Sequence, residues 1–426
     1  MKTKVNKDIF IIGFALFSMF FGAGNVIFPP YLGMGAGPHW LAGFLCYYAA
    51  DIGLALLTMF SMFRKGGYEP LVRPIGKVAS TLLMCTIVLC IGPMLAIPRT
   101  AATTYEMSVM PLLPGVGNWA FSISFFLLIF LLTLRESSVV DIVGQFLTPM
   151  LLIGLLILIT VGIFHPLGDI AALAQAENIA ATGIKAGYQT MDVLATLIFG
   201  ILILHSATKK GYTEPALRSK VAGQAGLIAG GILFVIYGGL TYLGATVSGI
   251  YDLSISRSAL VLAIVRGLLG NAGTVLFSIV VALACITTAV GLVSSCADYF
   301  SMLCKDRLSY RFLVTLICVF SAVACNVGLD ELISLAAPVL DIIYPPTLVL
   351  IVLSCLKPLP VPVYRMGALG AFLFSVLSVA SSYTQLALPL LNDLPFAALG
   401  FGWVLPTAIF AGLGFLIPDK HSRRAR

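Results

Sequence analysis

Apolar runs of about 20 residues recur along the whole chain, and each is long enough to cross the hydrocarbon core of a bilayer as a helix. The chain is 59% hydrophobic and only 10% charged, with a mean hydropathy of +1.04, which excludes an ordinary soluble domain. In lipid, a run of this length satisfies its backbone N–H and C=O groups as a helix. We therefore predict an all-α polytopic membrane protein with about twelve spans. They lie near residues 9–31, 40–62, 75–98, 119–134, 142–164, 189–207, 221–247, 272–301, 312–328, 332–355, 366–390 and 397–417.

Lysine and arginine residues collect in every second connection between the predicted spans. Such residues accumulate on the cytoplasmic side of a membrane. With both termini in the cytoplasm, the external side holds only four of the 25 Lys and Arg residues, namely Arg99, Lys185, Arg257 and Arg266. We therefore expect a multi-pass protein of the cell membrane with an even number of spans and both termini cytoplasmic.

The first predicted span contains a segment that does not suit a continuous helix. Gly22-Ala23-Gly24-Asn25 is followed by Pro29-Pro30, and Asn25 is the only amide side chain between Asp8 and Tyr31. The glycines let the backbone leave helical geometry with little steric cost. Unwound backbone at membrane depth normally lines a cavity, because each unsatisfied polar group costs several kcal/mol in lipid. We interpret the break as the binding site of a transporter.

A weaker signal of the same kind lies in the predicted span 189–207. Gly200, which follows Thr196 and Phe199, lies at a depth similar to the first break. Because the two spans start on opposite sides of the membrane, helices 1–5 and 6–10 would form an inverted repeat within a single domain. The alternative is that Gly200 only packs against a neighbouring helix. The expected parts of the single transporter domain 1–426 are a first repeat at 1–164, a second repeat at 188–355 and two C-terminal helices at 364–417. The polar connection 165–187 is expected to form an external re-entrant or surface helix.

The segment around Gly22 and a second segment, Gly92-Pro93-Met94-Leu95-Ala96-Ile97-Pro98-Arg99-Thr100, resemble the bacterial branched-chain amino acid:cation symporter family. The resemblance runs through essentially the whole chain and includes Ser294-Ser295-Cys296-Ala297-Asp298-Tyr299. It implies import of leucine, isoleucine and valine by alternating access, coupled to sodium or protons. It also implies the LeuT-type fold, a five-helix inverted repeat with broken helices one and six, here followed by two extra helices.

A zwitterionic amino acid needs donors for its carboxylate, acceptors for its ammonium group and an apolar cavity for its side chain. A broken helix supplies the first two through the free N–H and C=O groups at its half-helix ends. Tyr105 is a candidate gate or carboxylate partner, with an interfacial aromatic anchor as the alternative. The expected substrate site comprises Gly22, Ala23, Gly24, Asn25, Tyr105, Thr196, Phe199 and Gly200.

Sodium prefers hard oxygen ligands. The resemblance suggests a sodium site formed by the carbonyls of Ser18, Phe21 and Ala284 with the hydroxyls of Thr287 and Thr288. The alternative for each hydroxyl is a bond to its own helix. A proton is the alternative coupling ion, carried by a buried carboxylate, and no other cofactor is expected.

Ionisable residues within apolar runs are candidates for function. Asp51, Asp192, Asp298 and Asp341 fit that description, although Asp192 and Asp298 lie near predicted helix ends, where they would be solvated. Arg99 and Glu106 would share one helix face and are expected at an external gate.

Other classes of protein fit less well. An intramembrane enzyme would need a paired nucleophile or an HExxH zinc motif, and His39, His165, His205 and His421 have no such partner in the sequence. A channel would show repeated selectivity rings, which one asymmetric chain does not display. The nine cysteines form no CxxC pair, which argues against a disulfide framework or a zinc site. The net charge of +7 belongs to cytoplasmic loops, so the expected partners are the amino acid substrate and membrane lipids, and not nucleic acid.

Overall fold

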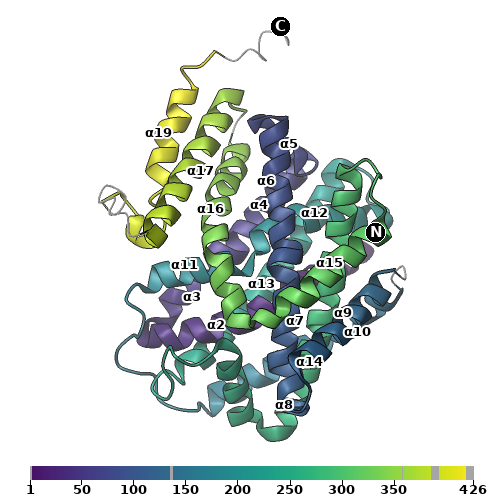
Figure 1. Ribbon diagram of the computed structural model, residues 1–426, viewed down its shortest axis with the longest axis vertical. Coiled ribbons are helices and arrows are strands. Elements are labelled where there is room, and N and C mark those ends of the chain that lie inside the picture. Colours follow the sequence, from purple (N-terminus) through teal and green to yellow (C-terminus); the bar gives the residue numbers. More distant parts are fainter. Residues whose placement is uncertain (1, 135–137, 357, 385–392, 419–426) are drawn as a thin grey trace.

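The computed structural model describes residues 2–134, 138–356, 358–384 and 393–418, and helices joined by short connections dominate this part of the chain (Figure 1). No strand occurs among the described residues, so the all-α prediction is confirmed. Residues 385–390 of the predicted span 366–390 and the side chains of His205 and His421 lie outside the described part.

The first predicted break is confirmed. Helix α1 (Lys2–Phe20) ends and α2 (Ala23–Ala36) begins on either side of Gly22, whose backbone is extended at φ −105° and ψ −171°. The Gly22 N–H donates to the Phe20 carbonyl at 2.9 Å, and the Asn25 N–H donates to the Gly22 carbonyl at 3.1 Å. In a continuous helix these donors would serve the carbonyls of Ser18 and Phe21. The break therefore frees two carbonyl oxygens.

The second break is at Met191, so the prediction that it lies at Gly200 was wrong. Helix α11 (Ile179–Thr190) ends at Met191, which has φ +69°, and α12 (Asp192–Lys209) starts directly after it. Gly200 lies inside α12, where an added Cβ would stand 3.0 Å from Met62 Cε. The packing alternative therefore describes Gly200.

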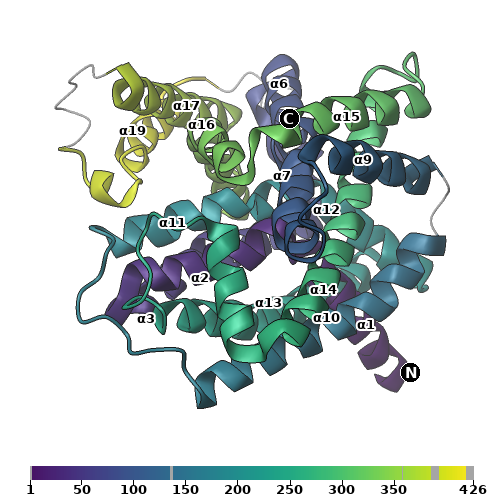
Figure 2. The same ribbon diagram turned by 60° about the horizontal axis from the view of Figure 1, so that its bottom comes forward.

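Helix α11 lies within the connection that was expected to form a separate external helix. It is instead the first half of the broken helix, and it begins before the expected start of the second repeat at 188. It packs on α3 (Trp40–Tyr48) and on the following π-helical turn, Ala49–Gly53 (Figure 2). A Cβ added at Gly187 would stand 2.9 Å from the Tyr47 carbonyl oxygen, so a glycine allows this close approach.

Two further predicted spans have different limits. The helix predicted at 75–98 does not end at Pro98; α6 (Lys77–Leu89) passes through a π-helical turn at Cys90–Met94 into α7 (Ala96–Thr104) and continues to Leu112. The span predicted at 272–301 is the second part of α14 (Arg257–Leu303), which is kinked at Gly270 with φ +65°.

The other helices follow the predicted order. Their bounds are α4 (Leu54–Lys65), α5 (Glu69–Val72), α8 (Met110–Leu112), α9 (Asn118–Leu134), α10 (Ser138–Phe164), α13 (Pro215–Ala245), α15 (Tyr310–Ala324), α16 (Leu329–Cys355), α17 (Val361–Thr384) and α19 (Val404–Gly414). Within the described ranges, eight helices are long and apolar enough to cross a membrane, and three shorter helices are also apolar. The count of twelve spans stays a prediction.

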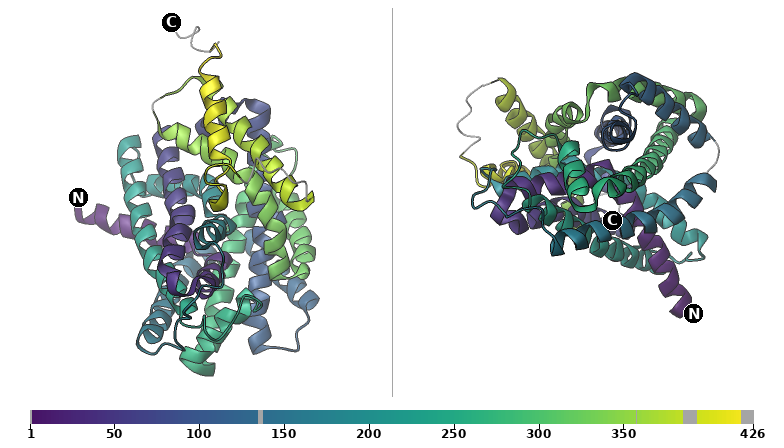
Figure 3. Two further views of the ribbon diagram at one scale, coloured as in Figure 1. Left: turned by 90° about the vertical axis from the view of Figure 1, so that its left-hand side faces the viewer. Right: turned by 90° about the horizontal axis from the view of Figure 1, so that it is seen from below.

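The C-terminal helices α17 and α19 pack against each other at one side of the molecule, next to α16 (Figure 3). Helix α13 instead lies in the centre of the fold and runs along both α1 and α2. Its contact with α2 is a backbone contact: a Cβ added at Gly244 would stand 1.9 Å from the Pro30 carbonyl oxygen, and one at Gly33 would stand 1.8 Å from that of Thr241. These glycines bring α13 directly against the half-helix that follows the first break.

We expect Gly244→Ala to destabilise the protein by about 1–3 kcal/mol, the usual cost of overpacking, because the methyl group would collide with the fixed backbone of α2. Gly231→Ala, on the same helix, is the matched control, since no atom of the described residues lies within 4 Å of its Cβ position. Thermal unfolding of the purified proteins in detergent measures the difference. Equal melting temperatures for the two variants would contradict this account of the α2–α13 contact.

Candidate functional site

The two helix breaks lie against each other, and Asn25 joins them. Its two side-chain amide hydrogens are shared among three acceptors, which are the Phe20 carbonyl and the Asp192 carboxylate, both at 2.7 Å, and the Tyr237 hydroxyl. Asn25 is only 1% exposed. One buried amide thus connects the end of α1 and the start of α2 with the start of α12 and the middle of α13.

A cavity of ≈ 40 Å³ lies between the breaks. Six predicted residues line it: Gly22, Ala23, Gly24, Asn25, Phe199 and Thr288. The remaining lining residues are Met19, Phe20, Ile91, Ala96, Arg99, Thr100, Thr190, Met191, Asp192, Ala195 and Leu292.

Three predicted substrate residues lie elsewhere. Gly200 packs on Met62, as described above, and the Thr196 hydroxyl donates to the Asp192 carbonyl at 2.7 Å, within its own helix. The Tyr105 hydroxyl donates to the Val116 carbonyl at 2.9 Å. Tyr105 lines a separate, larger cavity of ≈ 990 Å³. None of these three residues lines the cavity between the breaks.

Arg99 lines this cavity, whereas Glu106, which was expected beside it at an external gate, lines a different one. Arg99 is 5% exposed, and its guanidinium donates to the carbonyls of Gln189 and Thr190 at the C-terminal end of α11. Its Nε atom is buried and has no hydrogen-bond partner among the described residues. A buried arginine with a free donor beside a cavity suits an anionic group. The sequence signal for this role was an arginine inside an apolar run.

Asp192 was expected to be solvated, but it is 7% exposed and stands directly after the second break. Asp51, which is fully buried, accepts a hydrogen bond from the Thr190 hydroxyl at 2.8 Å. The other two aspartates differ from this pair. Asp298 is exposed, and Asp341 lines a different cavity, together with Lys185.

Three of the five predicted sodium ligands lie at the first break. The Thr288 hydroxyl is buried and has no hydrogen-bond partner in the described part of the chain, and its oxygen is 4.0 Å from a Cβ built on Gly22. The freed carbonyls of Ser18 and Phe21 belong to the same break. The Thr287 hydroxyl, in contrast, donates to the Ala284 carbonyl at 2.8 Å, so the own-helix alternative describes Thr287.

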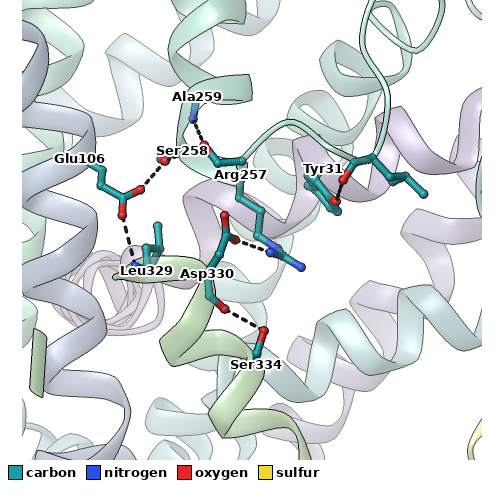
Figure 4. A network of polar contacts seen from close by, with 10 residues as sticks. Tyr31, Glu106, Arg257, Ser258, Ala259, Leu329, Asp330 and Ser334 are labelled. Carbon is teal, nitrogen blue, oxygen red and sulfur yellow. Dashed lines mark hydrogen bonds and ion pairs between the residues drawn. The ribbon is translucent and has the colours of Figure 1, made fainter. Parts of the chain in front are cut away.

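A polar network closes the fold at the end of α2 that lies beyond the cavity (Figure 4). Arg257 forms an ion pair with Asp330 and lies 4.5 Å above the ring of Tyr31. Glu106 accepts hydrogen bonds from the Ser258 hydroxyl and, at 3.2 Å, from the Leu329 N–H. These contacts join α2, α14 and α16 with the helix that carries Glu106.

A second set of contacts holds the opposite half of the broken helix. Asp8 of α1 forms an ion pair with Lys210 at 3.3 Å and accepts a hydrogen bond from the Tyr212 hydroxyl at 2.9 Å. The two networks therefore hold α1 and α2 on either side of the break, and the cavity lies between them.

Comparison with known proteins assigns the chain to a group of carriers. A family model described as branched-chain amino acid transport protein matches residues 5–421. The branched-chain amino acid permease BrnQ of Escherichia coli K12 is 36% identical over 430 residues, which cover 98% of this chain and 97% of the relative. The branched-chain amino acid transport system 3 carrier protein of Pseudomonas aeruginosa is 38% identical over 425 residues, with 96% and 95% covered.

Solved structures share the fold at low sequence identity. Closed Mhp1, a nucleobase-cation-symport-1 family transporter with bound bromovinylhydantoin, superimposes with a TM-score of 0.63 at 12% identity and covers 97% of this chain and 95% of its own. MhsT in complex with L-phenylalanine gives a TM-score of 0.53 at 16% identity, with 95% and 98% covered. The predicted LeuT-type fold is thereby confirmed, whereas its division into two five-helix inverted repeats stays a prediction.

The network of Figure 4 is expected to hold the closed arrangement only weakly, because Arg257 and Asp330 are 24% and 35% exposed and such pairs contribute about 0.2–1 kcal/mol. Asp330→Asn should therefore increase hydrogen–deuterium exchange at the starts of α14 and α16 by up to about fivefold. Glu331→Gln is the control, because no ion pair of Glu331 occurs among the described residues. Equal exchange in both variants would show that the ion pair does not hold this end closed.

Proposed function

The chain belongs to the branched-chain amino acid transport protein family, and we propose that it imports leucine, isoleucine and valine by sodium-coupled alternating access. The observation that carries this proposal is the cavity between two helix breaks, where two buried polar atoms, Arg99 Nε and Thr288 Oγ1, have no partner in the described residues. Such atoms are costly unless a ligand completes their bonding.

The cavity offers complementary groups for the two charges of an amino acid. The first N–H groups of α2, at Ala23 and Gly24, have no partner within the helix and lie at its positive dipole end. With Arg99 they supply donors for a carboxylate. The Asp192 carboxylate is an acceptor suited to an ammonium group. The apolar side chains around them are Ile91, Ala195, Phe199 and Leu292.

Sodium is the preferred coupling ion in this proposal because uncharged oxygens gather at the first break. The carbonyls of Ser18 and Phe21 have lost their helical donors, and the Thr288 hydroxyl of α14 lies beside Gly22, between α1 and α2. Ala284 and Thr287 complete the proposed set if the Thr287 hydroxyl turns away from its own helix. Protons are the alternative coupling ion.

The proposed orientation follows from the charge bias of the loops. Both termini are assigned to the cytoplasm, so the Asp8 contacts close the cytoplasmic side and the Arg257 network closes the external side. One charge moving inward across 100 mV supplies about 2.3 kcal/mol. That free energy corresponds to about 50-fold accumulation of substrate, because 1.4 kcal/mol is a factor of ten.

The direct test is uptake of labelled leucine into proteoliposomes under an imposed sodium or proton gradient. Uptake that follows the sodium gradient supports the proposal, and uptake that follows only the proton gradient favours the alternative. Absence of leucine uptake under either gradient would overturn the proposed function.

We expect Gly24→Leu to abolish leucine binding while the protein still inserts and folds. A Cβ at this position would already stand 3.1 Å from Arg99 Nη2 and 3.2 Å from the Phe28 ring. The larger leucine side chain would therefore occupy the place proposed for the carboxylate of the bound substrate. Gly154→Leu is the control, because its Cβ position has no atom of the described part of the chain within 4 Å. Binding is measured on monodisperse purified protein. Near-parental affinity in Gly24→Leu would mean that the break is only a packing device.

We expect Thr288→Ala to raise the sodium concentration for half-maximal leucine uptake tenfold or more, since loss of one cation ligand exceeds the 1.4 kcal/mol that a factor of ten requires. Thr288→Ser keeps the oxygen and should stay active. Thr315→Ala is the control, because it removes an exposed hydroxyl that donates to the Arg311 carbonyl of the same helix. Sodium titrations at fixed pH and membrane potential compare the proteins. If leucine uptake by the parent protein did not depend on the sodium concentration, the proposed sodium site would be excluded.

A further inference from the structure

Two carboxyl groups from different helices meet behind the cavity. Asp51 lies in the π-helical turn Ala49–Gly53, and Asp192 lies at the start of α12. They are 0% and 7% exposed, and they lie close enough for each carboxyl group to affect the ionisation of the other. Thr190 links them as well, because its hydroxyl donates to Asp51 at 2.8 Å and accepts from the Asp192 N–H at 3.4 Å.

Only one cation acts on this pair within the described part of the chain. Arg99 of α7 interacts with Asp192, and it is held by the carbonyls that end α11. The other titratable groups that face the carboxyl pair are tyrosines from α3, α13 and α16, namely Tyr47, Tyr48, Tyr237 and Tyr344. Tyrosine hydroxyls carry no charge at neutral pH, so they do not balance a second carboxylate.

The charge balance therefore decides the protonation of the pair. Two ionised carboxylates and Arg99 would leave one uncompensated negative charge in a fully buried cluster, and such a charge is very costly. Carboxyl groups in contact cannot both ionise without strong repulsion. One bound proton makes the cluster neutral and turns the repulsion into a hydrogen bond.

The surroundings show which residue holds that proton. Asp192 accepts the Asn25 amide hydrogen at 2.7 Å and lies near Arg99, and both contacts favour its ionised form. The single hydrogen of the Thr190 hydroxyl is shared between the Gly187 carbonyl at 2.6 Å and Asp51 Oδ1 at 2.8 Å, while Asp51 Oδ2 is buried and receives no donor among the described residues. The ionised form of Asp51 is therefore less stabilised than that of Asp192, and Asp51 is the residue that holds the proton.

We propose that Asp51 and Asp192 form a proton-binding site. While the cavity is closed, Asp51 holds one proton and uses it to donate a hydrogen bond to the Asp192 carboxylate. The inference rests on the proposed function, because Asp192 also lines the proposed substrate cavity. The proton ties the π-helical turn of Asp51 to the second break. When the breaks open to water, both carboxylates become solvated and the proton is released to bulk water.

Infrared spectroscopy tests the site without transport. The purified, substrate-free protein, labelled with ¹³C at its aspartate carboxyl groups, should show the carbonyl stretch of a protonated aspartic acid at neutral pH. Asp51→Asn should lose this band, and Asp298→Asn, which changes an exposed aspartate, should keep it. Asp192→Asn should also lose the band, because Arg99 then balances the one remaining carboxylate and the cluster is neutral without a bound proton. A parent protein without the band, or Asp51→Asn with it, would overturn the proposal.

The pH dependence of leucine uptake at a fixed sodium gradient is the second readout. As pH rises and the shared proton is lost, uptake by the parent protein should fall, by about tenfold per pH unit once the pair is mostly deprotonated. Asp51→Asn keeps a hydrogen-bond donor toward Asp192 at every pH, so its uptake should persist into the alkaline range. Equal alkaline loss in both proteins would contradict the proton site. If leucine is not transported at all, the proposed function fails, whereas the infrared band still decides on the proton.

Discussion

Backbone and polar groups inside a bilayer must find their partners within the protein, and the fold depends on how the two broken helices meet this constraint. Each unsatisfied group in lipid costs several kcal/mol. Asn25 removes part of that cost by bonding the Phe20 carbonyl before the first break and the Asp192 carboxylate after the second. Arg99 does the same for the last carbonyls of α11. The breaks are stable because they face each other.

Close backbone packing keeps the breaks together. Helix α13 touches α2 through Gly244 and Gly33, and its Tyr237 hydroxyl accepts the Asn25 amide hydrogen. Small residues at helix contacts are the usual means of tight association in membranes, where the hydrophobic effect does not drive helices together. The polar groups of the site are therefore held by a helix that contributes little to the cavity itself.

The sequence predicted the first break and missed the second for one physical reason. The glycines at and near Gly22 indicate the first break, because glycine leaves helical geometry at little energetic cost. Met191 adopts φ +69° without that advantage, and surrounding contacts hold it there, so no local signal marks it. Likewise, adjacent Thr287 and Thr288 look equivalent in the sequence. Only the rotation of α14 in the fold turns one hydroxyl to its own helix and the other toward Gly22.

In the proposed mechanism, the first break contributes to the binding of both sodium and the proton of the Asp51–Asp192 pair. Because both cations depend on this break, their binding can be coupled. Loss of helical pairing frees the carbonyls of Ser18 and Phe21 for sodium, whereas the Phe20 carbonyl between them is taken by Asn25. Asn25 in turn stabilises the ionised Asp192 that accepts the proton of Asp51. A movement of α1 relative to α2 would therefore change both sites at once. By linkage, each cation must then alter the affinity for the other by the same factor.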